Sequence, residues 1–335
     1  MLRRIACILS IIALLVGGTV LGSGSQAFAS EKPQFVKIAG SSLAGTWFRI
    51  CAMAAAILNE KVEGTTFSAT LGGGISNIKR IDSAKLEMGL AMTSGLGFAQ
   101  YGTGPFKGSP TKKVAAIGVL YKSPYHLVVR ADSDIQSPAD LSNKQIAVGK
   151  NGWSTELFAR TVLESYNLSY EKIKKNGGGV HFVGWGPMAR LMKDKRIDAA
   201  IFATPVPVPQ LLDVTTAHPI RVLNFDKQHL DWFAKNYPAY YQMPIAKGSY
   251  KGHVEDITTF GDSVTMTINR DIDDDLAYKI TKALFENKKV LAKVHKALSS
   301  MSPENALTGI KVPLHPGAYR FYKEKGIKVP KDITP

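Results

Sequence analysis

Cysteine is almost absent from this chain: its 335 residues include two, Cys7 and Cys51. Cys7 lies in an N-terminal stretch with the features of a secretory signal peptide, so a processed chain would keep Cys51 alone. One cysteine cannot form an internal disulfide, and stability must come from buried apolar cores. Cys51 lies in a helical segment rich in Ala, Ile and Met, where a small core residue is expected.

Long apolar runs are also scarce, since the only one is at residues 5–20. Arg3 and Arg4 precede it and Ala27-Phe28-Ala29 follows it as a small-residue cleavage site, so residues 1–29 are predicted to be a signal peptide. Glycines interrupt the run, which argues against a retained membrane anchor. Cleavage near Ala29 would leave an exported chain long enough for two domains.

Signatures of catalysis and of metal binding are missing as well. The seven histidines show no H-E-x-x-H or other close metal spacing, and no serine lies in a G-x-S-x-G elbow. The loop at residues 149–155 lacks the Gly-Lys-Ser/Thr end of a phosphate-binding loop. We therefore expect no catalytic residue, no metal-ligating residue, no cofactor and no enzymatic activity, while the question whether a metal ion assists ligand binding stays open.

Negative charge is in short supply: 42 Lys and Arg against 27 Asp and Glu give a net charge of +15, which falls to +13 without Arg3 and Arg4. The lysines are scattered, as is typical of solvated faces. Export makes nucleic acid an unexpected partner. The charge gives a weak preference for an anionic ligand or an acidic docking surface.

What the sequence does contain is a repeated unit of strand, glycine-rich loop and helix. The run V-K-I-A-G-S-S-L-A-G-T-W-F-R-I at residues 36–50 has an echo at residues 146–163, and the spacing of Gly40 to Thr46 matches that of Gly149 to Thr155. The sequence of residues 81–93 also aligns with that of residues 192–204 at a constant offset of 111. Alternating strands and helices predict an α/β fold with parallel-type sheets, flanking helices and two similar lobes facing a cleft.

The expected elements define two lobes and their connections. Strands are expected at 65–71, 88–92, 146–148 and 180–183, and helices at 47–59, 155–166 and 188–195. Strands at 115–120, 126–130 and 263–269 are candidates for hinge connections. The remainder, residues 275–322, is expected to be helical and to pack on lobe 1. Lobe 1 would comprise residues 30–125 with 255–335, and lobe 2 residues 126–254.

Ligands of open parallel sheets bind beyond the carboxyl ends of the strands. The loops expected there are short and polar or glycine-rich: residues 41–47, 72–77, 93–97, 150–155, 184–187 and 204–209. Unpaired N–H groups and the helix dipole at a helix start attract a carboxylate. From the third and sixth loops, Ser94, Thr204 and Pro205 are candidate ligand-binding residues.

Simpler roles remain open for these residues. The Gly72-Gly73-Gly74 run can be a tight turn, the loop hydroxyls can be helix N-caps, and Trp47 and Trp153 can be core or hinge residues. Each tryptophan lies at a helix start, so each could instead form an apolar wall of the site.

Several segments, in this order, resemble the TAXI family of solute receptors of TRAP transporters. The resemblance is carried by I-A-G-S-S-L-A-G-T-W-F, G-G-G-I-S-N-I, L-Y-K-S-P-Y-H-L-V-V-R, V-G-K-N-G-W-S-T and V-P-L-H-P-G-A followed by Y-K-E-K-G. It implies a two-lobed periplasmic binding protein of type II. Such a receptor closes on a small carboxylate or an amino acid such as glutamate and delivers it to TRAP membrane permease subunits.

Carried over by position, the resemblance implies pocket residues on three loops: Ser41, Ser42, Thr46, Trp47, Gly74, Asn77, Trp153, Ser154 and Thr155. The chain departs from the family twice. Trp47 and Phe48 replace two tyrosines of S-T-G-G-T-Y-Y, and an acidic residue common after the third strand is absent at Thr93-Ser94-Gly95. Both departures favour an anionic or more apolar ligand over a cationic one.

Two questions stay open at this point. A periplasmic sensor or adaptor for a membrane kinase would share these features, and an exported hydrolase that uses a loop serine is a weaker alternative. Lys150 or Arg190 could also supply a counter-charge to an anionic ligand.

Overall fold

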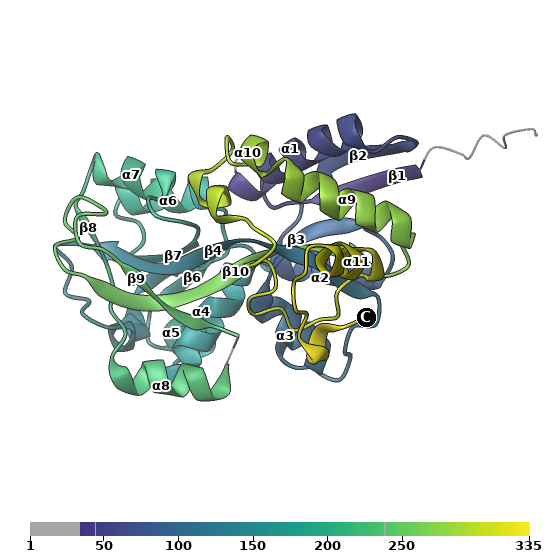
Figure 1. The fold of residues 1–335 in the computed structure, drawn as a ribbon. Coiled ribbons are helices and arrows are strands. Elements are labelled where there is room, and N and C mark those ends of the chain that lie inside the picture. The colour runs from purple at the N-terminus through teal and green to yellow at the C-terminus, as the bar shows by residue number, and fades with distance from the viewer. Residues whose placement is uncertain (1–33, 44, 238) are drawn as a thin grey trace, which may run out of the picture. The chain divides into compact units, whose positions relative to one another are not determined.

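The structure is a computed structural model that describes residues 34–43, 45–237 and 239–335, and the predicted signal peptide lies outside them. Within these residues ten strands form one mixed sheet in the order β2-β1-β3-β10-β4-β7-β5-β6, with β8 beside β4 and β9 beside β10. Helices flank the sheet (Figure 1). The expected α/β class is confirmed. No helix of the described residues is long and apolar enough to cross a bilayer.

The first part of the sheet follows the predicted pattern of strand and helix. In it β1 pairs in parallel with β2 and with β3. We call these strands and the helices that follow them the first lobe. Its elements are β1 (Gln34–Ala39), α1 (Thr46–Lys61), β2 (Thr65–Thr70), α2 (Gly74–Asp82), β3 (Met88–Met92) and α3 (Thr93–Tyr101), followed by the short η1 (Gly104–Phe106).

The second lobe repeats this order, because β5 pairs in parallel with β6 and with β7 as β1 does with β2 and β3. Strands β3 and β7 are fully buried and start 111 residues apart, at the offset seen in the sequence. The elements are η2 (Pro138–Asn143), β5 (Gln145–Ala147), α4 (Ser154–Ser165), α5 (Tyr170–Lys175), β6 (Gly179–His181), α6 (Trp185–Lys193) and β7 (Ala199–Ala203).

Four further elements complete the second part of the chain: α7 (Pro209–Thr215), β8 (Ile220–Val222), α8 (Lys227–Asn236) and β9 (Tyr241–Ile245). Strand β8 pairs with the end of β4, and β9 pairs with the start of β10. They widen the sheet beside the second lobe.

Two long antiparallel strands, β4 (Val114–Arg130) and β10 (Ile257–Asn269), join the lobes (Figure 1). β10 pairs with β3 of the first lobe, and β4 pairs with β7 of the second. The prediction of two strands at 115–120 and 126–130 was wrong about the break, because residues 121–125 stay extended within β4. β10 also begins earlier than the expected residue 263. The proposed lobe boundaries remain a prediction.

The C-terminal part is less helical than predicted. It contains α9 (Asp274–Glu286), α10 (Lys288–Leu291), η3 (Lys296–Ser300), α11 (Pro316–Glu324) and η4 (Lys331–Ile333), with turns and irregular structure at 301–315. Helix α9 packs against α1 and α11, as expected for a segment that returns to the first lobe. A Cβ at Gly317 would lie 2.2 Å from the Asp274 carbonyl oxygen, so glycine permits the close contact of α11 with α9.

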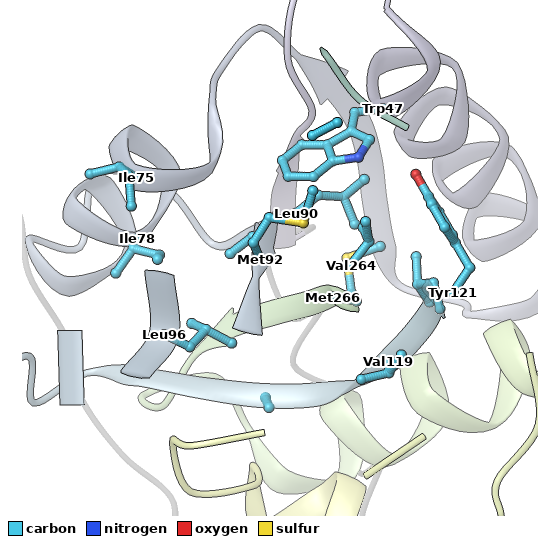
Figure 2. Close-up of a cluster of buried hydrophobic side chains, with 14 of the residues drawn as sticks. Trp47, Ile75, Ile78, Leu90, Met92, Leu96, Val119, Tyr121, Val264 and Met266 are labelled. Carbon is cyan, nitrogen blue, oxygen red and sulfur yellow. The ribbon is translucent and has the colours of Figure 1, made fainter. Parts of the chain in front are cut away.

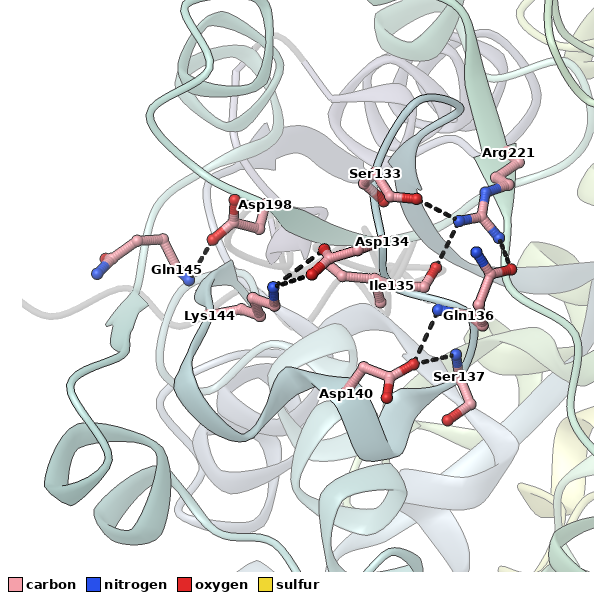
Figure 3. Close-up of polar contacts among 10 residues, drawn as sticks. All are labelled: Ser133, Asp134, Ile135, Gln136, Ser137, Asp140, Lys144, Gln145, Asp198 and Arg221. Carbon is pink, nitrogen blue, oxygen red and sulfur yellow. Dashed lines mark hydrogen bonds and ion pairs between the residues drawn. The ribbon is translucent and has the colours of Figure 1, made fainter.

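Polar contacts hold the chain between β4 and β5 in place (Figure 3). The Arg221 guanidinium of β8 donates to the carbonyl oxygens of Ser133 and Ile135 at 2.9 and 2.6 Å. The Asp140 carboxylate accepts from two backbone N–H groups at the start of η2. On the other side, the backbone N–H of Gln145 donates to Asp198 ahead of β7. These bonds set the position of β5 and of the loop that follows it.

A buried histidine on β4 predicts pH-dependent stability. The Nε2 atom of His126 lies 3.0 Å from the Tyr250 hydroxyl. Burial, with a smaller contribution from the nearby His253, lowers the pKa of His126 to about 3 from 6.5. Between these values the unfolded chain binds a proton that the folded chain does not. Stability is therefore lost as the pH falls from about 6.5 toward 3, by up to about 1.4 kcal/mol per pH unit from this group.

We expect His126→Gln to reduce that acid-side slope in urea unfolding measured from pH 7 to pH 4. Burial raises the pKa of Asp262 to about 6, which gives a contribution of opposite sign that both proteins share. The difference between the two proteins thus isolates His126. Equal slopes would contradict a neutral buried histidine.

Candidate functional site

A small cavity lies where strand ends of both lobes meet. Its volume is about 30 Å³, room for little more than a water molecule. It brings together six of the predicted site residues and four others. The predicted ones are Ser41, Trp47, Gly74, Trp153, Ser154 and Thr155, and the others are Gly73, Met92, Trp185 and Ala203.

Unpartnered polar groups of the second lobe face this cavity. The hydroxyls of Ser154 and Thr155 are buried, with side chains 6% and 3% exposed, and neither has a hydrogen-bond partner among the described residues. The indole N–H of Trp185 is likewise buried and has no hydrogen-bond partner among the described residues. A buried polar group without a partner is destabilising. Ten such side-chain atoms occur among the described residues, and the three that belong to residues of this cavity make it a candidate ligand site.

The capping alternative does not account for these hydroxyls. The N-cap residues of α1 and α4 are Gly45 and Trp153, and neither makes a side-chain capping bond. The first backbone N–H groups of an α-helix have no partner within the helix. The start of α4 thus adds main-chain donors and the positive end of a helix dipole to the Ser154 and Thr155 hydroxyls.

Aromatic side chains form most of the remaining wall. Trp47 and Trp153 are 7% and 8% exposed, and Trp153 meets Trp185 edge to face with ring centroids 6.0 Å apart. Figure 2 shows the Trp47 ring above Met92 and Leu90, with its indole nitrogen toward the Tyr121 hydroxyl. Trp47 therefore belongs both to the first-lobe core and to the wall of the cavity.

Trp185 was missed as a site residue. Its loop was among those predicted at the strand ends, and it starts α6 just as Trp47 and Trp153 lie at the starts of α1 and α4. That shared position was the signal that could have identified it.

The lobes touch at one edge of the cavity through main-chain bonds. The N–H groups of Ile75 and Ser76, at the start of α2, donate to the carbonyl oxygen of Gly152 at 3.1 and 3.2 Å. A Cβ at Gly73 would lie 2.4 Å from Cδ1 of Trp153, and one at Gly74 would lie 2.3 Å from the Ser154 hydroxyl. Glycine at both positions permits this approach, beyond the role of a tight turn.

The family model of the NMT1-like family matches residues 38–326, which include every residue that lines the cavity. The chain belongs to the NMT1-like family. The match does not test the resemblance to TAXI receptors, which remains a prediction.

Solved structures of binding proteins are similar to this NMT1-like protein at low identity. The periplasmic aliphatic sulphonate-binding protein SsuA of Escherichia coli is 14% identical with a TM-score of 0.46 over 90% of each chain. The alkanesulfonate-binding protein SsuA of Xanthomonas axonopodis pv. citri, bound to MOPS, is 14% identical with a TM-score of 0.48 over 88% of this chain and 91% of that one. PhnD1 of Prochlorococcus marinus, in complex with methylphosphonate, is 10% identical with a TM-score of 0.48 over 80% and 90%.

Asn77 of this NMT1-like protein is not among the cavity residues, although it was predicted to bind ligand. Its side chain is fully buried and serves the backbone. Oδ1 accepts from the Gly73 N–H at 3.1 Å, and Nδ2 donates to the carbonyl oxygens of Ala39, Gly40 and Leu90 at 2.9–3.1 Å. Asn77 therefore connects the first-lobe strand ends to the start of α2 and stabilises the backbone next to the cavity.

Ser94, predicted to bind ligand, makes its hydrogen bonds within the fold. Its backbone N–H and hydroxyl, together with the Thr93 hydroxyl, donate to the buried Asp262 carboxylate of β10. Burial raises the pKa of Asp262 to about 6 even though these bonds oppose the shift. An acidic group thus does lie beside the third-strand loop, contributed by a distant strand. Ser94 lines a separate cavity of about 120 Å³ between α3 and α8.

The other predicted residues lie outside the cavity lining. The Thr46 hydroxyl accepts a hydrogen bond from Arg49, and the Ser42 carbonyl accepts from the Gly45 N–H. Thr204 is buried, and Pro205 lines a separate groove beside β4 and η3. Lys150 and Arg190, left open as counter-charges, are exposed, and no described residue that lines the cavity carries a charge.

Replacement of Asn77 by Ala should destabilise the fold. Four buried backbone groups would lose their partner, so we expect a loss of about 2–4 kcal/mol in the free energy of unfolding, measured in urea. Asn176→Ala, at an exposed position, is the matched control and should change it by less than about 0.5 kcal/mol. A loss below about 1 kcal/mol at Asn77 would contradict its supporting role.

Replacement of Gly73 by Ala should hold the lobes apart at this edge. The added methyl group collides with the Trp153 ring, so the bonds from Ile75 and Ser76 to Gly152 should open. We expect their amide hydrogen exchange to accelerate by about tenfold and tryptophan emission to shift to the red. Gly186→Ala is the control, because its Cβ would meet nothing within 4 Å. Unchanged exchange at Ile75 and Ser76 would contradict this account.

Proposed function

We propose that this protein is a periplasmic solute receptor that binds a small organic anion between its lobes and delivers it to a TRAP-type permease. The observation that carries the proposal is the pair of buried, unpartnered hydroxyls of Ser154 and Thr155 at the start of α4, in a cavity shared by both lobes.

The donor set favours an anion over a cation. Ser154, Thr155 and the Trp185 indole offer hydrogen-bond donors, and the helix start adds a partial positive charge. No described side chain of the cavity lining is acidic, so a cation would lack a counter-charge there. The basic net charge of the chain would also favour the approach of an anion.

The same lining supports a receptor more than a hydrolase. A nucleophilic serine or threonine requires an adjacent general base. The described lining residues include no histidine, carboxylate or lysine beside Ser154 and Thr155. Their hydroxyls are thus suited to form hydrogen bonds with a ligand that is released without chemical change.

For delivery, the permease must distinguish the ligand-bound receptor from the ligand-free one. A ligand that contacts both lobes stabilises the closed arrangement relative to the open one and changes the surface offered to a permease. A sensor that signals to a membrane kinase would use the same closure, and the neighbouring genes distinguish the two roles. A TRAP permease gene beside this one favours transport.

Ligand binding should raise the melting temperature. A carboxylate present at about 100 times its Kd would add about 2.7 kcal/mol, a shift of roughly 5 °C for a chain of this size. We expect Ser154→Ala combined with Thr155→Val to weaken binding by about 10- to 100-fold, as measured by calorimetry. Ser165→Ala, at the other end of α4, is the control. If no small anion stabilises the folded protein, the receptor proposal fails.

A further inference from the structure

We infer that the ligand of this site is an amine-free carboxylate with a single negative charge and a flat, aromatic body. The inference rests on the proposed receptor function and narrows its ligand class. It contrasts with glutamate, which the TAXI resemblance offers as a typical ligand.

The walls of the cavity favour an aromatic body. Trp47 and Met92 approach from the first lobe, and Trp153 and Trp185 from the second, so apolar surface lies on both sides. The edge-to-face contact of Trp153 with Trp185 is the geometry that aromatic rings prefer. A flat ring is a thin apolar body: the walls must part by roughly 3.5–4 Å, the contact distance of carbon atoms, on the side of the cavity away from the bonds of Ile75 and Ser76 to Gly152.

The polar groups allow for one negative charge at one end. The three buried unpartnered donors of the cavity lining, on Ser154, Thr155 and Trp185, belong to the second lobe, and the first lobe adds the Ser41 hydroxyl. The first-lobe donors at the start of α2 are already bonded to the Gly152 carbonyl oxygen. A second carboxylate would therefore lie against Met92 and the indole rings with the Ser41 hydroxyl as its one side-chain donor, which compensates little of its lost hydration.

An α-ammonium group would lack a negatively charged partner in this site. The cavity lining holds no acidic side chain among the described residues. The buried Asp262 carboxylate is occupied by the hydroxyls of Thr93 and Ser94. The Gly152 carbonyl oxygen accepts two bonds from α2. Burial of an unpaired ammonium is strongly unfavourable, so an amino acid should bind far more weakly than the matching acid without nitrogen.

The decisive comparison uses two ligands that differ only by the α-ammonium group, hydrocinnamate and L-phenylalanine. With the full processed chain, calorimetry and tryptophan fluorescence should show hydrocinnamate binding roughly 100-fold more tightly. Benzoate should bind at least about tenfold more tightly than acetate or L-glutamate, because acetate lacks the ring and glutamate carries extra charges.

A variant tests the role of the Trp185 N–H separately from its ring. Trp185→Phe keeps an aromatic wall but removes the donor, and we expect it to weaken benzoate binding by about tenfold. Trp232→Phe, on α8 outside the cavity lining, is the matched control and should leave the affinity unchanged. An unchanged affinity in Trp185→Phe would overturn the assignment of that donor to the carboxylate.

The outcomes separate this inference from the proposed function. If L-phenylalanine or L-glutamate binds as tightly as the aromatic acids, the ligand class is overturned and the receptor function stands. The same holds if acetate or a dicarboxylate binds best. If no anion of the panel binds or raises the melting temperature of the folded chain, the receptor function itself is lost.

Discussion

The antiparallel pairing of β4 with β10 holds the two lobes together and sets where the neighbouring strands end. Both strands are buried almost throughout, and every other strand is placed by pairing outward from them. β3 lies against β10 and ends at Met92, while β7 lies against β4 and ends at Ala203. These two residues line the cavity from opposite lobes. The site thus exists because two lobes of like topology share one pair of strands.

Buried polar groups near the strand ends differ in whether the fold supplies them with partners. Asn77 and Asp262 are fully engaged with backbone and hydroxyl partners, and they hold α2 and α3 at the strand ends. Ser154 and Thr155 have no such partners, although they are buried at the start of α4. Seven other buried polar side-chain atoms of the described residues also lack a partner, but those of Ser154, Thr155 and Trp185 belong to residues that line one cavity, which makes that cavity the candidate place for a ligand.

Local patterns predicted the elements well where periodicity and neighbours agree. Strand β3 was predicted with its observed bounds, because a short apolar run between polar loops is typical of a buried strand of a parallel sheet. β4 was predicted with a break, since residues 121–125 include Lys122, Ser123 and Pro124, which favour a turn. Pairing with β10 on one side and β7 on the other keeps that segment extended. Such pairing partners are distant in sequence and invisible to a local reading.

For the candidate site, the residue pattern predicted the loops: glycine, hydroxyl and tryptophan residues at helix starts, without a catalytic set. Which of these residues share a cavity follows from the packing of distant strands, which no local pattern contains. Asn77, Ser94 and Ser154 have the same polar character, yet the first two contact backbone carbonyl oxygens or Asp262 and the third lines the cavity. A polar side chain is available to a ligand only if no partner from a distant strand already uses its hydrogen-bonding groups.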